Sequence, residues 1–68
     1  MELGEQLVVP RDLADALAAE PAAGRLFDSL SYGVRRWFVD SVTCAERPED
    51  RRARVERALG MLREAAAR

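Results

Sequence analysis

The chain has 68 residues, of which 49% are hydrophobic and 34% are charged, and its formal net charge at pH 7 is −1. A chain this short can bury only a modest core, so we expect residues 1–68 to form a single domain. The near-neutral charge argues against a simple polyanion-binding protein. A single cysteine excludes an internal disulfide, and without any histidine it cannot supply the four nitrogen or sulfur ligands of a typical zinc site.

The dominant residues are alanine, leucine, arginine and glutamate, which are all good helix formers, so we predict an all-α fold. No window approaches the roughly 18–20 apolar residues of a membrane span. The N-terminal segment carries acids where a signal peptide needs positive charge, and we therefore expect a cytoplasmic protein. Residues 1–8 lack helical periodicity. We expect residues 1–8 and 65–68 to be frayed, with at most a short extended arm near Leu7–Val9.

Three prolines divide the chain, and each stands where a helix can begin, because proline lacks the N–H that is unpaired in a first turn. Ser31 is a suitable N-cap for one further helix. Together these signals predict a small four-helix domain with helices at about 10–19, 21–29, 32–44 and 48–66.

Apolar residues recur at helical spacing within the predicted helices and define the expected core. This core comprises Leu13, Leu17, Leu26, Phe27, Leu30, Phe38, Val42, Val55, Leu59 and Leu62. We also expect Tyr32 and Trp37 to be part of it, with their polar atoms near the surface, and Val34 to start the buried stripe of the third helix. Gly24 and Gly60 each interrupt a helix, which a closely approaching neighbour helix would explain.

Arginines are concentrated at the start of the fourth helix, where four acids are interleaved with them. The candidate clamp or interaction residues are Arg47, Arg51, Arg54 and Arg57. One hypothesis is a phosphate-contacting face. The one we favour is a solvent-exposed face with internal pairs, such as Asp50 with Arg54 and Glu49 with Arg52.

Arg51 lies in the first turn of that helix, where a cation meets the positive end of the helix dipole. Such a residue needs a compensating partner elsewhere in the fold. We therefore predict that Arg51 is a tertiary clamp that pairs with a helix C-terminal carbonyl or with one acid of the preceding helices. The candidate acids are Asp12, Asp15, Asp28 and Asp40.

The sequence offers no catalytic constellation. Cys44 and the serines have no histidine to activate them, and no glycine-rich phosphate loop is present. The pair Asp12 and Asp15 stands on a short, exposed helix instead of in a cleft. We therefore expect a non-enzyme without a cofactor or metal. The alternatives are a weak nucleic-acid-binding module that uses the helical arginines and, less favoured, a redox protein that uses Cys44.

The order of residues resembles the YdeI/OmpD-associated (OmdA-like) family, often described as bacteriocin-protection proteins. The resemblance covers about residues 8–63. It rests on Val9-Pro10-Arg11-Asp12-Leu13-Ala14-Asp15-Ala16-Leu17, on Phe27-Asp28-Ser29-Leu30-Ser31, and on Ala45 to Val55 with Arg51 and Arg54 at the hallmark arginine positions. Departures are Glu46 for a lysine, Asp50 for a threonine, and Trp37 one turn before the usual tryptophan.

The resemblance implies a helical domain that carries no agreed catalytic residues and whose family name points to tolerance of antimicrobial peptides. We therefore expect a non-catalytic interaction domain with an unidentified protein partner, either a monomer or a weak dimer. The Lys-to-Glu change at Glu46 removes a charge that an anionic ligand of the family would need.

Overall fold

The computed structural model describes residues 7–68, which form four helices. These are α1 (Arg11–Ala18), α2 (Pro21–Ser29), α3 (Tyr32–Thr43) and α4 (Pro48–Ala66). The predicted all-α fold is confirmed, and the helix bounds differ from the predicted ones by at most one residue at each end. Residues 7–10 have no regular secondary structure, and the part of the expected frayed N-terminus at 1–6 lies outside the described residues.

The helix starts follow local chemistry. Pro21 and Pro48 occupy the first turns of α2 and α4, where a missing N–H costs nothing. Ser31 is the N-cap of α3, and its side-chain oxygen accepts the backbone N–H of Val34 at 3.3 Å. Pro10 is the N-cap residue of α1, whereas the sequence predicts it to be the first residue inside that helix.

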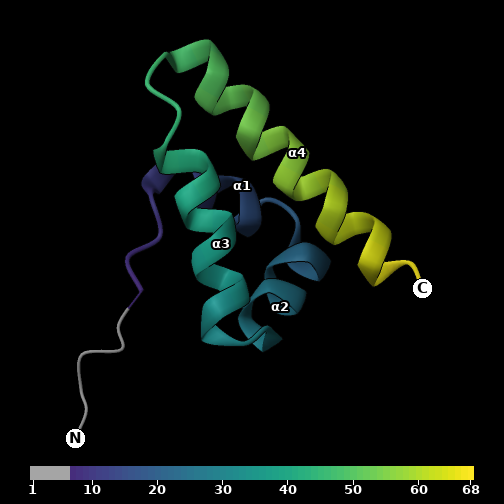
Figure 1. Ribbon diagram of the computed structural model, residues 1–68. Coiled ribbons are helices and arrows are strands. Elements are labelled where there is room, and N and C mark those ends of the chain that lie inside the picture. Colours follow the sequence, from purple (N-terminus) through teal and green to yellow (C-terminus); the bar gives the residue numbers. More distant parts are fainter. Residues whose placement is uncertain (1–6) are drawn as a thin grey trace, which may run out of the picture.

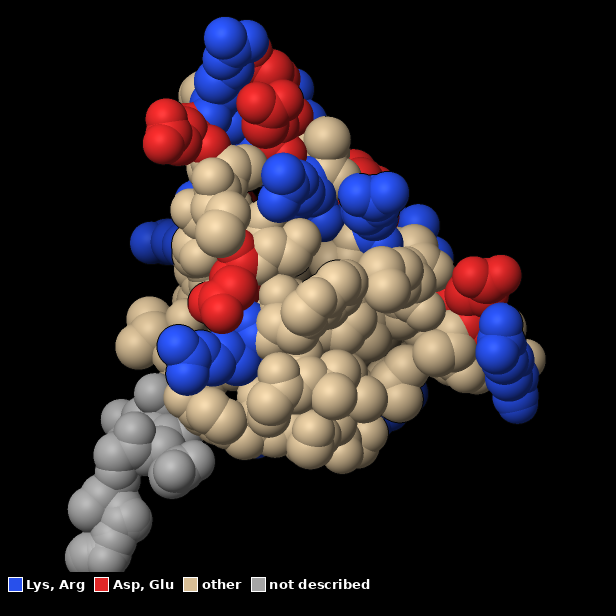
Figure 2. All heavy atoms as spheres, in the orientation of Figure 1, with Lys and Arg blue, Asp and Glu red and all other residues tan. Residues whose placement is uncertain are grey.

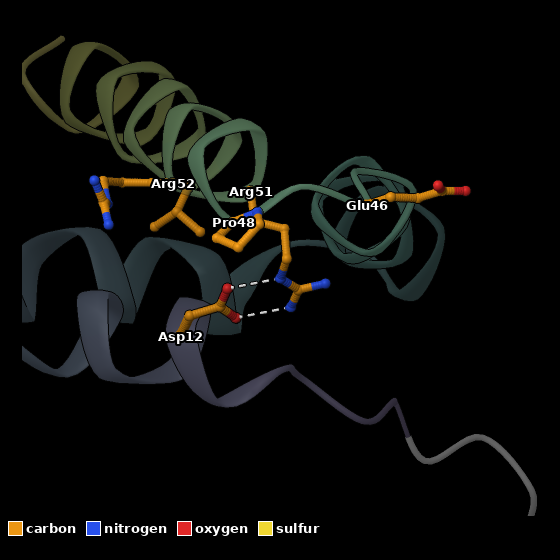
Figure 3. A pocket seen from close by; sticks show the side chains of 6 residues that line it. Asp12, Glu46, Pro48, Arg51 and Arg52 are labelled. Carbon is orange, nitrogen blue, oxygen red and sulfur yellow. Dashed lines mark hydrogen bonds and ion pairs between the residues drawn. The ribbon is translucent and has the colours of Figure 1, made fainter.

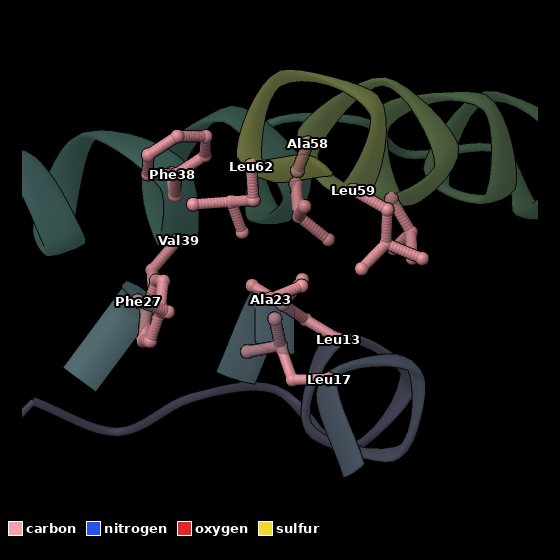
Figure 4. Packing of buried hydrophobic residues seen from close by; sticks show 11 residues of the cluster. Leu13, Leu17, Ala23, Phe27, Phe38, Val39, Ala58, Leu59 and Leu62 are labelled. Carbon is pink, nitrogen blue, oxygen red and sulfur yellow. The ribbon is translucent and has the colours of Figure 1, made fainter. Parts of the chain in front are cut away.

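The longest helix, α4, packs against all three other helices, and α1 also packs against α2 (Figure 1). The buried side chains of α4 point toward those of the shorter helices (Figure 4). The core consists of Leu13, Leu17, Ala23, Phe27, Phe38, Val39, Val42, Val55, Ala58, Leu59 and Leu62. Leu7 and Val9 pack against this core from the N-terminal side, as an extended arm would.

Eight of the ten core residues named from the sequence are buried, whereas Leu26 and Leu30 are only partly buried at its edge. The buried face of α3 is rotated from the predicted one toward Val39. Phe38, which the sequence already predicts to be buried, meets Phe27 edge-on at a ring-centroid distance of 6.1 Å.

The rotation of α3 turns two predicted core residues outward. Val34 is 44% exposed and Trp37 is 55% exposed, so their assignment to the core was wrong. Trp37 keeps one contact with the interior, since its ring meets Phe38 edge-on at a centroid distance of 5.1 Å. Tyr32 is half-buried.

The two interrupting glycines differ in their surroundings. A Cβ on Gly24 would lie 3.1 Å from the backbone oxygen of Leu17, so the expected close approach of α1 and α2 is confirmed. A Cβ on Gly60 would meet nothing within 4 Å, so the expected close crossing there was wrong.

This difference predicts opposite outcomes for two matched substitutions. Gly60→Ala should raise the free energy of unfolding by about 0.5–1 kcal/mol, because it restricts the unfolded chain at no steric cost. Gly24→Ala restricts the unfolded chain in the same way, but its Cβ pushes against the backbone carbonyl of Leu17. Its free energy of unfolding should therefore be lower than that of the wild type. Urea unfolding of both variants measures this, and equal stabilisation would contradict the close approach at Gly24.

Candidate functional site

Arg51 joins the start of α4 to α1. Its Nε donates to Oδ2 of Asp12 and its Nη2 to Oδ1, both at 3.1 Å (Figure 3). This two-pronged geometry holds both side chains in one orientation, although 31% of the Arg51 side chain and 41% of the Asp12 side chain stay exposed. Asp12 was one of the four acids proposed from the sequence as partners of Arg51. The contribution of the pair to stability remains a prediction.

Asp12 is stabilised as a carboxylate in this position. The hydrogen bonds from Arg51 lower its pKa, partial burial acts in the opposite direction, and the backbone N–H of Leu13 at 2.9 Å lowers it further. The clamp is therefore strongest when Asp12 is charged.

Arg54 joins α4 to the C-terminal end of α3. Its Nη1 donates to the backbone oxygen of Ser41 at 2.6 Å. The N–H of Ala45, which would otherwise reach Ser41, donates to Val42 instead. The guanidinium thus satisfies an unpaired carbonyl at the negative end of the α3 dipole. The pairing of Arg54 with Asp50 expected from helical spacing was wrong.

Arg63 makes a third contact of this kind, which the sequence analysis missed. Its Nε donates to both oxygens of Glu20, at 2.8 and 3.1 Å, and its Nη2 also bonds to Oε2. Glu20 is the N-cap residue of α2, so this pair joins α4 to the α1–α2 corner. The hydrogen bonds lower the pKa of Glu20. The two residues are 43 positions apart, and no local spacing pattern reveals such a pair.

The remaining arginines of the cluster lie outside these contacts. Arg47, Arg52 and Arg57 are exposed, and none of them takes part in an ion pair within residues 7–68. The pairing of Arg52 with Glu49 was therefore also wrong. Two of the four candidate interaction residues, Arg51 and Arg54, are engaged within the chain, and two, Arg47 and Arg57, face solvent.

A groove of about 400 Å³ lies beside the Arg51–Asp12 pair. Its lining also includes Glu46, Pro48, Arg52 and Val55. Figure 3 shows Glu46 pointing away from the ion pair. Two arginines and two acids line the groove, so it has no net charge that would select an anion or a cation.

A second surface feature is apolar. Gly33, Val34 and Trp37 lie along α3 and are all exposed, and we refer to these three residues as the Trp37 face. On α4, Met61 is 43% exposed. Figure 2 shows a broad uncharged area between α3 and the C-terminal half of α4, with charged side chains above it and at its sides.

Three further observations concern residues 7–68. Cys44 is an exposed free thiol at the C-terminal cap of α3. Within that range no three acidic or cysteine side chains gather as metal ligands could. Also within it, no helix combines the length and the apolar character needed to span a membrane.

Comparison with known proteins adds one finding. The sequence model of the family described as OmdA, "Bacteriocin-protection, YdeI or OmpD-Associated", matches residues 6–65. The chain belongs to the OmdA family. No curated protein and no solved structure gives a significant match.

In this OmdA domain the stretch with the hallmark arginines, Ala45 to Val55, begins in the α3–α4 connection and continues into α4. It holds both Arg51 and Arg54, which bond to α1 and α3. Its two most recognisable positions therefore make contacts within the fold.

The clamp can be tested by removing its cation. Arg51→Ala should lower the free energy of unfolding by up to about 1 kcal/mol, as for a well-oriented but partly exposed pair. For a domain this small, that amounts to about 4–8 °C in Tm. Arg51→Lys should recover only part of the loss, because an ammonium cannot donate in two parallel bonds. Arg57→Ala is the matched control, and an equal Tm for all variants would refute the clamp.

The lowered pKa values of Asp12 and Glu20 predict that the stability of the fold decreases in acid. A carboxylate with a lower pKa in the folded state contributes stability above its unfolded pKa of about 4, and this contribution disappears as pH falls through the folded value. The Tm should therefore decline between about pH 5 and pH 2. In Asp12→Asn combined with Glu20→Gln, Tm should be lower at pH 7 and depend less on pH. A double variant with an unchanged pH profile would contradict this assignment.

Proposed function

We propose that this OmdA domain is a non-catalytic protein-interaction module and that the Trp37 face is its contact surface. The observation that carries the proposal is the 55% exposure of Trp37, the largest side chain of the molecule. Tryptophan is enriched among the residues that contribute most binding energy in protein interfaces. The indole is also held in place by its edge contact with Phe38, so little side-chain freedom is lost on binding.

The arrangement around Trp37 supports this role. The neighbouring Val34 is 44% exposed, and Gly33 has no side chain that would cover Val34 or Trp37. A partner can therefore contact both apolar side chains. The charged residues that flank Trp37 on α3, Arg36 and Asp40, pair with each other at 3.5 Å. A partner can therefore cover the apolar side chains without burying an unpaired charge.

The cellular context of the proposal comes from the family description. We propose that the interaction takes place in the cytoplasm and serves tolerance of antimicrobial peptides or a related stress. What supports this step is family membership alone.

The test is a comparative capture experiment. Immobilised wild-type domain and Trp37→Ala are incubated with the native cytoplasmic extract, and the bound proteins are quantified by mass spectrometry. A partner should be retained by the wild type and reduced at least tenfold in Trp37→Ala, since loss of a central aromatic residue typically costs 2 kcal/mol or more. Val8→Ala, at another exposed apolar residue, is the control. Equal capture by the wild type and by Trp37→Ala would refute the assignment of the Trp37 face.

The competing hypothesis of nucleic-acid binding has less support. Arg51 and Arg54, two of its four candidate arginines, already bond within the chain. We expect negligible affinity for DNA at about 150 mM salt, because few phosphates could be neutralised. Submicromolar binding that disappears in Arg51→Glu combined with Arg54→Glu would favour this alternative.

A further inference from the structure

Gly33 faces open space instead of a neighbouring part of the described chain. It lies in the first turn of α3, and a Cβ added there would meet nothing within 4 Å. Glycine is a poorer helix former than alanine, and neither packing nor a left-handed backbone conformation requires it here. At Gly24, by contrast, an added Cβ would lie 3.1 Å from the backbone oxygen of Leu17 in α1.

Trp37 stands one helical turn after Gly33, and the same helix thus presents a large exposed ring next to an open gap. Residues four positions apart are neighbours on a helix surface. When two such helices run antiparallel about a two-fold axis, the ring of each copy faces the gap of the other. The knob and the hole that a helix contact needs are then both supplied by one sequence.

We propose that the Trp37 face binds a second copy of this chain, in an antiparallel α3–α3 contact with Trp37 of each copy seated over Gly33 and Val34 of its partner. The proposal rests on the proposed function, in that it uses the same surface, and it names the partner. The exposed tryptophan of each molecule then contacts the same surface of a second molecule.

Charge on α3 favours pairing between identical surfaces. Two copies of a like-charged face would repel, but Arg36 and Asp40, which flank Trp37, neutralise each other within the chain. The area required is also small. A weak dimer buries about 600 Å² on each copy, which is about one eighth of the 4841 Å² accessible surface.

The experiment measures the mass of the full chain by sedimentation equilibrium from about 10 µM to about 1 mM, a range in which weak dimers form. The wild type should rise from the monomer mass of 7.6 kDa toward twice that value. Trp37→Ala should stay monomeric over the whole range. Gly33→Gln should also stay monomeric, because the added side chain fills the gap that receives the partner ring.

Gly33→Gln separates the contact from the fold. Glutamine is a better helix former than glycine, and its Cβ meets no neighbour at this position, so Tm at low concentration should be equal or higher. Ala22→Gln, which enlarges an exposed residue of α2, is the control and should associate like the wild type. A monomeric wild type at about 1 mM, or a Gly33→Gln variant that still dimerises normally, would overturn the proposal.

The two proposals fail in different ways. A monomeric wild type that still captures another protein through Trp37 would refute self-association and leave the interaction function in place. A wild type that is monomeric and whose captured proteins are unaffected by Trp37→Ala would refute both.

Discussion

The packing of α4 against the other three helices is the interaction on which the rest of the structure depends. Its buried residues, Val55, Ala58, Leu59 and Leu62, cover side chains from α1, α2 and α3 at once. The two first helices have only eight and nine residues, lengths at which an isolated helix is marginal in water. They are therefore helical because they can bury an apolar stripe against α4. Without α4, the apolar side chains that they bury against it would be exposed to water.

The arginine contacts have a different physical role from this apolar packing. Arg51, Arg54 and Arg63 lie beside the apolar stripe of α4, and each reaches a different element. Exposed pairs contribute little to the free energy of folding, whereas apolar packing alone tolerates sliding and rotation. Three directional contacts along one helix define how α4 is oriented. Two of these contacts, those of Arg51 and Arg54, stand at the hallmark arginine positions of the resemblance, so in this chain those positions join helices of the fold.

Local chemistry made the helices predictable from the sequence. Three prolines, the Ser31 cap and the apolar spacing of α4 all act over a few residues, and the helix ends agree to within one position. The orientation of α3 was not predictable, because Trp37 and Val39 are both apolar and flank Phe38, and helical spacing alone does not decide which of the two is buried. Likewise, the electrostatic cost of Arg51 in a first turn indicated that a partner exists, but Arg63 suffers no such cost at its position. Its bond to Glu20 depends on tertiary geometry alone.

The pairs between Asp12 and Arg51 and between Glu20 and Arg63 join the first helices to the last one, across separations of 39 and 43 residues. A ribosome makes the chain in one direction, so α1, α2 and α3 are all synthesised before their common partner exists. Throughout that interval Leu13, Leu17 and Phe27 have no α4 to cover them, and exposed apolar residues of this kind invite aggregation. Folding of this domain therefore waits for the synthesis of α4, and chaperones that shield apolar segments have that interval in which to act.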